Sequence, residues 1–240
     1  MRQEAPAGSQ GPEGEQAPGA EKLAAVAAVF HAVFADEEVT LAGGFPEPFY
    51  RAPCPAGPTG PEGPDGQGPD GQGPGGQGPG GPRPGGPRPG GQRSGAEIRF
   101  TRDYLNSSLH EIAHWCIAGR ERRRLDDYGY WYRPDGRNGS EQAEFFRAEA
   151  APQSLEWAFA MACGEAFRMS CDNLAGEASG HAEFAAALRG KLAGYLEGGF
   201  PVRAGRFLEG LLERFHPGIA EGERLAWLRS RAEATDLRAG

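Results

Sequence analysis

More than any other feature, a stretch of glycine and proline limits the folds open to this 240-residue chain. Between Gly57 and Gln92, 26 of 36 residues are Gly or Pro. Such a segment has too few apolar side chains to offset the entropy lost on folding, so it does not fold alone. It opens with Gly-x-y triplets and then changes to five-residue units such as GPDGQ. A collagen triple helix needs glycine at every third position, so we expect a flexible loop instead.

The position of this segment predicts the domain organisation. We expect a disordered leader at residues 1–22, a folded domain at 23–220 with a disordered Gly/Pro-rich insertion at 51–95, and a C-terminal tail at 221–240. Residues 48–51 (PFYR) and 97–100 (EIRF) flank the insertion, and both are typical of short strands. The insertion therefore lies inside a strand-loop-strand element.

Composition excludes several classes of protein. Hydrophobic residues make up 38% of the chain, and no run approaches the roughly 18 apolar residues of a membrane span. A net charge of −8 argues against a general nucleic-acid binder, although residues 120–124 hold four arginines. Four cysteines without a close C-x-x-C pair form neither a disulfide framework nor a zinc knuckle, which favours a cytoplasmic location. Glutamates rather than cations precede the apolar residues 23–35, which argues against a signal peptide.

Apolar periodicity predicts the secondary structure. Helices are expected at residues 23–35, 104–118, 152–163, 181–196 and 204–215, and the tail after residue 221 has room for another. Pro152 is placed at the start of its helix, where proline is favoured. Residues 126–137 are expected to form a strand followed by a tight turn. The fold class is therefore α+β: a helix-dominated single domain with a small β-sheet and the helix at 104–118 in its core.

That central helix carries the strongest chemical signal, the motif His110-Glu111-Ile112-Ala113-His114. Residues four apart stack on one face of a helix, so both imidazoles can reach one metal ion with Glu111 beside them. The alternative is a pair of histidines that only cap or pack.

A metal held by two histidines needs a third protein ligand, and a carboxylate of the following helix is the natural source. Glu149 and Glu156 are the candidates, and we favour Glu149. Two histidines and one carboxylate suit either catalytic zinc or non-haem Fe(II), so the motif leaves the metal open.

Weaker signals lie in two turn-rich segments. Asp135, beside an aromatic run that includes Tyr130, could help to hold an extended cationic side chain, as could Asp172 in the segment SCDN. A β-turn with a half-buried aromatic cluster, and a helix cap, explain the same residues equally well.

Four segments, HEIAHWCIAG, YGYWYRPDGR, E-x-x-P-Q-x-L and SCDNL, occur in this order and together resemble the bacterial elongation factor P hydroxylase family. Members of that family hydroxylate the modified lysine of elongation factor P after another enzyme has attached a β-lysyl group to it. The resemblance implies that His110, His114 and Glu149 are metal ligands and that Glu111, the catalytic candidate, is a neighbouring acid or a residue that supports the ligands. The Gly/Pro insertion and the leader before residue 20 have no counterpart in the family.

The resemblance implies a cytoplasmic, Fe(II)-dependent monooxygenase that consumes O₂ and completes the modification of elongation factor P, with an unidentified reductant. It implies neither a nucleic-acid nor a membrane partner. From the motif alone, a zinc-dependent HExxH metallopeptidase with Glu111 as general base is the rival, followed by a binding module with a structural HExxH.

Overall fold

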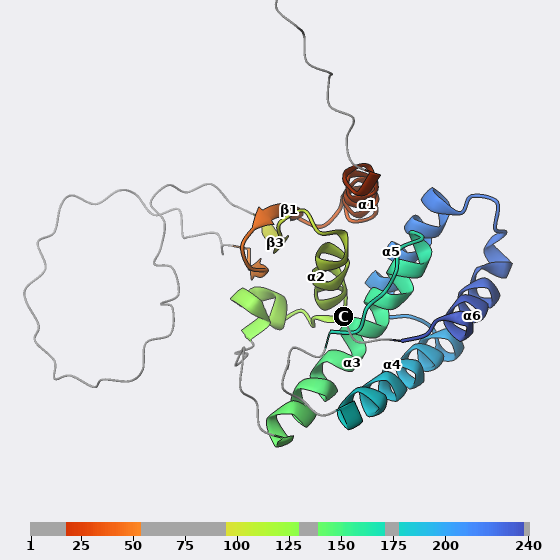
Figure 1. Cartoon of the computed structure of the whole chain (residues 1–240). Coiled ribbons are helices and arrows are strands. Elements are labelled where there is room, and N and C mark those ends of the chain that lie inside the picture. Colours follow the sequence, from red (N-terminus) through yellow and green to blue (C-terminus); the bar gives the residue numbers. More distant parts are fainter. Residues whose placement is uncertain (1–17, 54–94, 130–138, 171–177, 238–240) are drawn as a thin grey trace, which may run out of the picture. The chain divides into compact units, whose positions relative to one another are not determined.

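The computed structural model describes residues 18–53, 95–129, 139–170 and 178–237, all of which belong to one compact unit (Figure 1). The described helices are α1 (Pro18–Val33), α2 (Leu105–Ile117), α3 (Gly139–Ala162), α4 (Ala178–Gly198), α5 (Val202–Phe215) and α6 (Arg224–Ala234). The strands are β1 (Val39–Phe45), β2 (Phe49–Arg51) and β3 (Ala96–Thr101). The expected helix-dominated α+β fold with a small sheet is confirmed.

The sheet places β3 between the other two strands. β2 runs antiparallel to β3 and pairs Tyr50 with Ile98, which confirms that the two strands flanking the insertion pair with each other. β1 runs parallel to β3 and pairs Leu41 with Ile98 on the other side. Strand β1 was not predicted from the sequence.

Two glycines explain why β1 is hard to see in the sequence. The register between β1 and β3 shifts between Ala42 and Phe45, so the strand contains a bulge. A Cβ atom on Gly43 would lie 2.6 Å from the Phe100 ring, and Gly44 has a φ of +86°. Both positions therefore need glycine, which interrupts the apolar-polar alternation that marks a strand.

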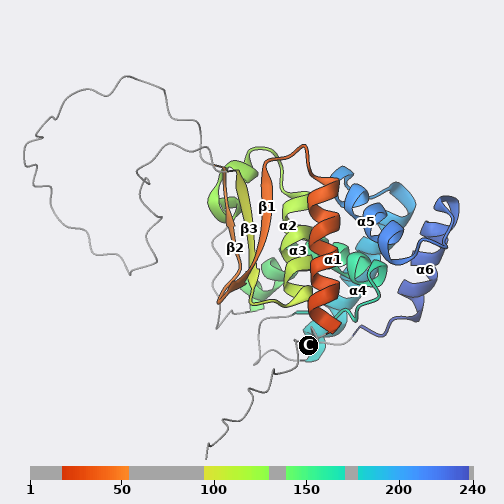
Figure 2. The same ribbon diagram turned by 90° about the horizontal axis from the view of Figure 1, so that it is seen from above.

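Helix α2 lies between the sheet and the other helices, and contacts β3 on one side and α3 and α5 on the other (Figure 2). Leu109, Ile112 and Cys116 are buried as their spacing predicts. Trp115 is also buried, and its ring centroid lies 5.6 Å from that of Phe30 in α1 and 4.7 Å from that of Phe34, the residue just after α1. Each such side chain contributes about 1.5–3 kcal/mol when fully buried, so α2 is held firmly on both sides.

The expected start of helix α3 at Pro152 is wrong, because the helix begins well before this residue. The helix starts at Gly139 and keeps Pro152 in its interior. Proline there has no N–H to donate to the carbonyl oxygen of Ala148, which costs a helix about 3 kcal/mol. Burial of Phe145 and Glu149 on the preceding turns, together with the packing of α3 on α2, keeps the helix continuous.

The segment after α2 also differs from expectation. Residues Asp126–Gly129 form a 3-10 turn, η2, instead of a strand. Asp127 and Tyr128 both have positive φ angles, of 47° and 56°. The carboxylates hold this turn against β2, because Asp127 accepts a hydrogen bond from the Tyr50 N–H and Asp126 accepts one from the Ala52 N–H, each at 2.9 Å. The rest of the expected strand and turn, residues 130–137, lies outside the described residues.

The remaining helices follow the sequence closely. Helices α4 and α5 overlap the expected ranges 181–196 and 204–215. Helix α6 lies in the tail after residue 221, where a further helix was considered. Helix α1 begins at Pro18, earlier than the expected residue 23, and ends at Val33. Within the described ranges, no helix combines the length and the apolar character needed to cross a bilayer.

Candidate metal centre

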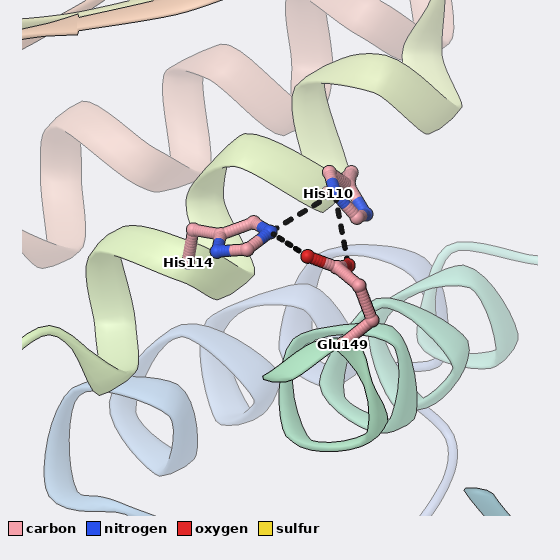
Figure 3. Close-up of side chains that lie close together, drawn as sticks. All are labelled: His110, His114 and Glu149. Carbon is pink, nitrogen blue, oxygen red and sulfur yellow. Dashed lines mark hydrogen bonds and ion pairs between the residues drawn. The ribbon is translucent and has the colours of Figure 1, made fainter. Parts of the chain in front are cut away.

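Helix α2 presents His110 and His114 from consecutive turns of one face, as the HExxH spacing predicts (Figure 3). Their Nε2 atoms lie 3.0 Å apart. The carboxyl end of this helix is fixed by two guanidinium groups, since Arg203 and Arg123 donate to the carbonyl oxygen of Ala118 at 2.6 and 2.9 Å. Cations at a helix C-terminus also interact favourably with the helix dipole, so the histidines stand on an anchored support.

Helix α3 brings Glu149 to the same point (Figure 3). Its Oε1 atom lies 3.4 Å from His114 Nε2, and its Oε2 atom lies 3.6 Å from His110 Nε2. One nitrogen or oxygen from each of the three residues falls within 4.8 Å of the others. The Glu149 side chain is only 5% exposed, so the carboxylate is held inside the protein.

These separations fit the ligand shell of a small divalent ion. Two ligands bound at about 2.1 Å to a tetrahedral or octahedral ion lie roughly 3.0–3.4 Å apart. The distances of 3.0, 3.4 and 3.6 Å between the Nε2 and carboxylate oxygen atoms are close to this spacing. His110, His114 and Glu149 can therefore hold one ion and leave further coordination positions open.

The charges of the site favour a cation. Burial alone would raise the pKa of Glu149, but the rings of His114 and His110 lower it to about 2. Burial alone would lower the pKa of His110, but Glu156, Glu149 and Glu111 raise it to about 10. The negative charges that hold a proton strongly on His110 would also stabilise a bound metal cation.

Two further residues of α3 contact the three-residue cluster from outside it. Glu156 Oε2 lies 2.8 Å from His110 Nδ1, the ring nitrogen that faces away from the cluster. Gln153 donates to Glu149 Oε2 at 3.4 Å and to the Ser170 carbonyl at 2.8 Å, and it accepts from the Ser170 N–H at 3.0 Å. Gln153 was not predicted as a site residue, although its spacing of four from Glu149 puts both on one helix face.

A cavity of about 430 Å³ opens beside His114. Its walls come from α2, the loop after α2, η2 and α3, and include Ile117, Arg120, Arg122, Ala148 and Pro152. The wall is apolar near the histidine and charged in the loop, where Glu121 lies between the two arginines. A slender side chain could therefore reach the open side of the cluster from this cavity.

Tyr128 forms another part of this wall and connects the sheet to the site. Its ring stacks on Tyr50 at 4.2 Å and lies nearly parallel to the His114 ring, with centroids 6.5 Å apart. The two residues with positive φ in η2 make this placement possible. Strained backbone of this kind persists where the surrounding structure holds it, and is common at functional sites.

The other sequence-predicted residues fall into two groups. Glu111 lies near the histidines, and burial raises its pKa, but its carboxylate is not part of the three-residue cluster. Tyr130, Asp135 and Asp172 lie outside the described residues.

Fold and site together define a class: helix-dominated α+β proteins in which an HExxH helix and a glutamate of the next helix form a two-histidine, one-carboxylate cluster. Residues 87–224, more than half of the chain, match the family described as elongation factor P hydroxylase. The chain belongs to this family. The resemblance drawn from the four sequence motifs is thereby confirmed.

A relative from Haemophilus influenzae is named elongation factor P lysine hydroxylase. It is 47% identical to this chain over 107 residues, which cover 45% of the chain and 60% of the relative. The matching part thus spans less than two thirds of the relative's length.

Proposed function

We propose that this protein hydroxylates the β-lysylated lysine side chain of elongation factor P and thereby completes the modification of that factor. The observation that carries the proposal is the cluster of His110, His114 and Glu149 beside a cavity, in a chain of the elongation factor P hydroxylase family. The name of the Haemophilus influenzae relative supports the same substrate. The reaction takes place in the cytoplasm, where translation factors act.

The metal we propose is Fe(II), held by His110, His114 and Glu149 with Glu111 as a neighbouring acid. When bound, Fe(II) supplies the one-electron chemistry that activates O₂ for attack on a C–H bond. The cavity walls formed by Ile117, Ala148 and Pro152 suit the methylene groups of a lysyl chain and exclude water around them.

The net reaction balances with one external donor. One oxygen atom of O₂ enters a C–H bond of the substrate, and the other is reduced to water with two electrons and two protons. The substrate C–H bond gives up two of the four electrons that O₂ accepts, and a two-electron reductant supplies the other two. The protein's part is to bind the chain, to hold the metal and to keep one C–H bond facing the open coordination positions.

The partner docks as a folded protein that projects one modified lysine. Arg120, Glu121 and Arg122 line the cavity and are exposed, which gives this rim one net positive charge in a chain whose net charge is −8. A basic rim of this kind favours an acidic surface around the projecting lysine. Neither a nucleic acid nor a membrane is part of this proposal.

A zinc peptidase is less well supported. Such an enzyme would use Glu111 to take a proton from a zinc-bound water, which requires its carboxylate beside the metal. The cluster alone does not separate the two enzymes, because two histidines and one glutamate, with Glu111 beside them, also suit a zinc peptidase. The family match favours the hydroxylase, so no second function is proposed.

The test uses the full chain, purified without air and loaded with Fe(II). β-Lysylated elongation factor P, O₂ and a chemical two-electron reductant are added, and the factor is analysed by intact-mass spectrometry. The expected product is heavier by one oxygen atom. His114→Ala should retain the fold, because the core rests on residues such as Leu109 and Ile112, and should give no product.

Two controls make the result specific. Elongation factor P with an unmodified lysine should gain no oxygen, and the zinc-loaded protein should be inactive. Cleavage of generic peptides by the zinc form, with no oxygen transfer by the iron form, would replace this proposal with the peptidase.

A further inference from the structure

His110 has different partners at its two ring nitrogens. Nε2 faces the cluster, 3.0 Å from His114 Nε2 and 3.6 Å from Glu149 Oε2. Nδ1 faces α3, where it lies 2.8 Å from Glu156 Oε2. A carboxylate can only accept a hydrogen bond, so it pairs with an Nδ1 that carries a proton. In a neutral imidazole the lone pair is then on Nε2, the atom that faces the cluster.

Glu156 is well placed to hold the ring in this state. It lies seven residues after Glu149, about two helical turns, so both carboxylates project from the same face of α3. Its side chain is 8% exposed, and its neighbours Leu155 and Trp157 are buried. A short hydrogen bond from a buried, rigid helix restricts rotation of the His110 ring.

The same geometry argues against Glu156 as a ligand. The two nitrogens of an imidazole point in divergent directions, so an ion on Nε2 of His110 is remote from a carboxylate on Nδ1. The described three-residue cluster accordingly contains Glu149 and not Glu156. Glu149 therefore lies beside Nε2 of the His110 ring, and Glu156 lies beside Nδ1 of the same ring.

We propose that Glu156 is a positioning residue, whose hydrogen bond to Nδ1 orients His110 and presents Nε2 to the ion. The inference rests on the metal site of the proposed function and adds a residue that acts only through a ligand. A carboxylate that accepts from the outer N–H of a metal-bound histidine fixes its tautomer and makes it a stronger ligand.

The test is a titration of the metal-free full chain with Co(II) and with Zn(II), independent of turnover. Glu156→Leu removes the acceptor, and the affinity for both ions should fall about 10- to 100-fold. Glu156→Gln keeps an amide oxygen that can accept from Nδ1–H, so it should rescue most of the loss. Glu165→Gln, which removes a negative charge from the Lys22 ion pair, should bind like the wild type.

A second measurement follows the hydrogen bond itself. In the zinc-bound wild type, proton NMR should show a slowly exchanging, downfield signal from the His110 Nδ1–H. The signal should be lost in Glu156→Leu and retained in Glu156→Gln. Circular dichroism would check that each variant is folded.

The outcomes separate this inference from the proposed function. If the wild type binds the ions and Glu156→Leu binds them equally tightly, the positioning role is wrong while the metal site stands. A Glu156→Gln variant as weak as Glu156→Leu would also overturn it, since charge and not the hydrogen bond would then matter. A wild type that binds no divalent ion would overturn both proposals.

Discussion

Adding a single methyl group at Gly210 should destabilise the protein, because α1 and α5 approach closely at this position. A Cβ atom there would lie 2.8 Å from Val33 Cγ2 and 2.9 Å from Val29 Cγ1. Valine is stiff at χ1 in a helix, so neither methyl group can easily move aside. Val29 is also buried, and α1 carries the Phe30 ring that packs on Trp115 of the histidine-bearing helix.

The magnitude follows from two opposing effects. Overpacking a core position costs about 1–3 kcal/mol, whereas replacing glycine by alanine inside a helix gains about 1 kcal/mol. We expect Gly210→Ala to lose about 1 kcal/mol of unfolding free energy net. Gly194→Ala is the matched control, because Gly194 lies on an exposed part of α4 with nothing within 4 Å of its added Cβ. The control should gain about 1 kcal/mol.

Thermal unfolding of the metal-free protein measures both changes. For a domain of this size 1 kcal/mol shifts Tm by about 2–4 °C. The Tm of Gly210→Ala should therefore lie about 2–4 °C below that of the wild type and the Tm of Gly194→Ala about 2–4 °C above it. If Gly210→Ala raises Tm as much as Gly194→Ala does, then α1 and α5 do not pack this closely and the reasoning fails.

Three other predictions concern the site and the insertion. The lowered pKa of Glu149 stabilises the metal-free protein fully above pH 4.5, and this stability is lost as the pH falls through about 2; in urea denaturation across this range, Glu149→Gln should lack that part of the pH dependence. Tyr128→Phe should raise Tm, because the buried hydroxyl has no hydrogen-bond partner among the described residues and such a group costs about 1–3 kcal/mol; a lower Tm would mean that the hydroxyl is paired in solution. Deleting residues 63–92 should leave Tm nearly unchanged, since loop length alters closure entropy only slowly; a loss above about 2 kcal/mol would show that the segment packs.

The elements that the sequence predicts well are those formed by local contacts. The helix expected at residues 104–118 is α2 at Leu105–Ile117, because apolar residues at spacings of three and four identify its buried face. The strands on either side of the insertion were recognised from their composition, and they pair as an antiparallel ladder. In each case short-range pattern and final packing agree.

The errors occur where long-range contacts override a local preference. Pro152 indicates a helix start, yet α3 continues through it because the preceding turns are buried against the rest of the protein. The left-handed residues of η2 are stabilised by hydrogen bonds to β2, which is distant in sequence. Strand β1 depends on a parallel partner, β3, that follows it after the whole insertion.

The candidate site divides in the same way. His110 and His114 share a face through helical geometry alone, so the HExxH spacing was sufficient to pair them. Glu149 and Glu156 also share a face of α3, so helical geometry could not distinguish between them. The packing of α3 on α2 makes the distinction, because it places Glu149 beside both Nε2 atoms and Glu156 beside Nδ1 of His110. That arrangement depends on how two separate helices dock, which the spacing of residues within either one does not encode.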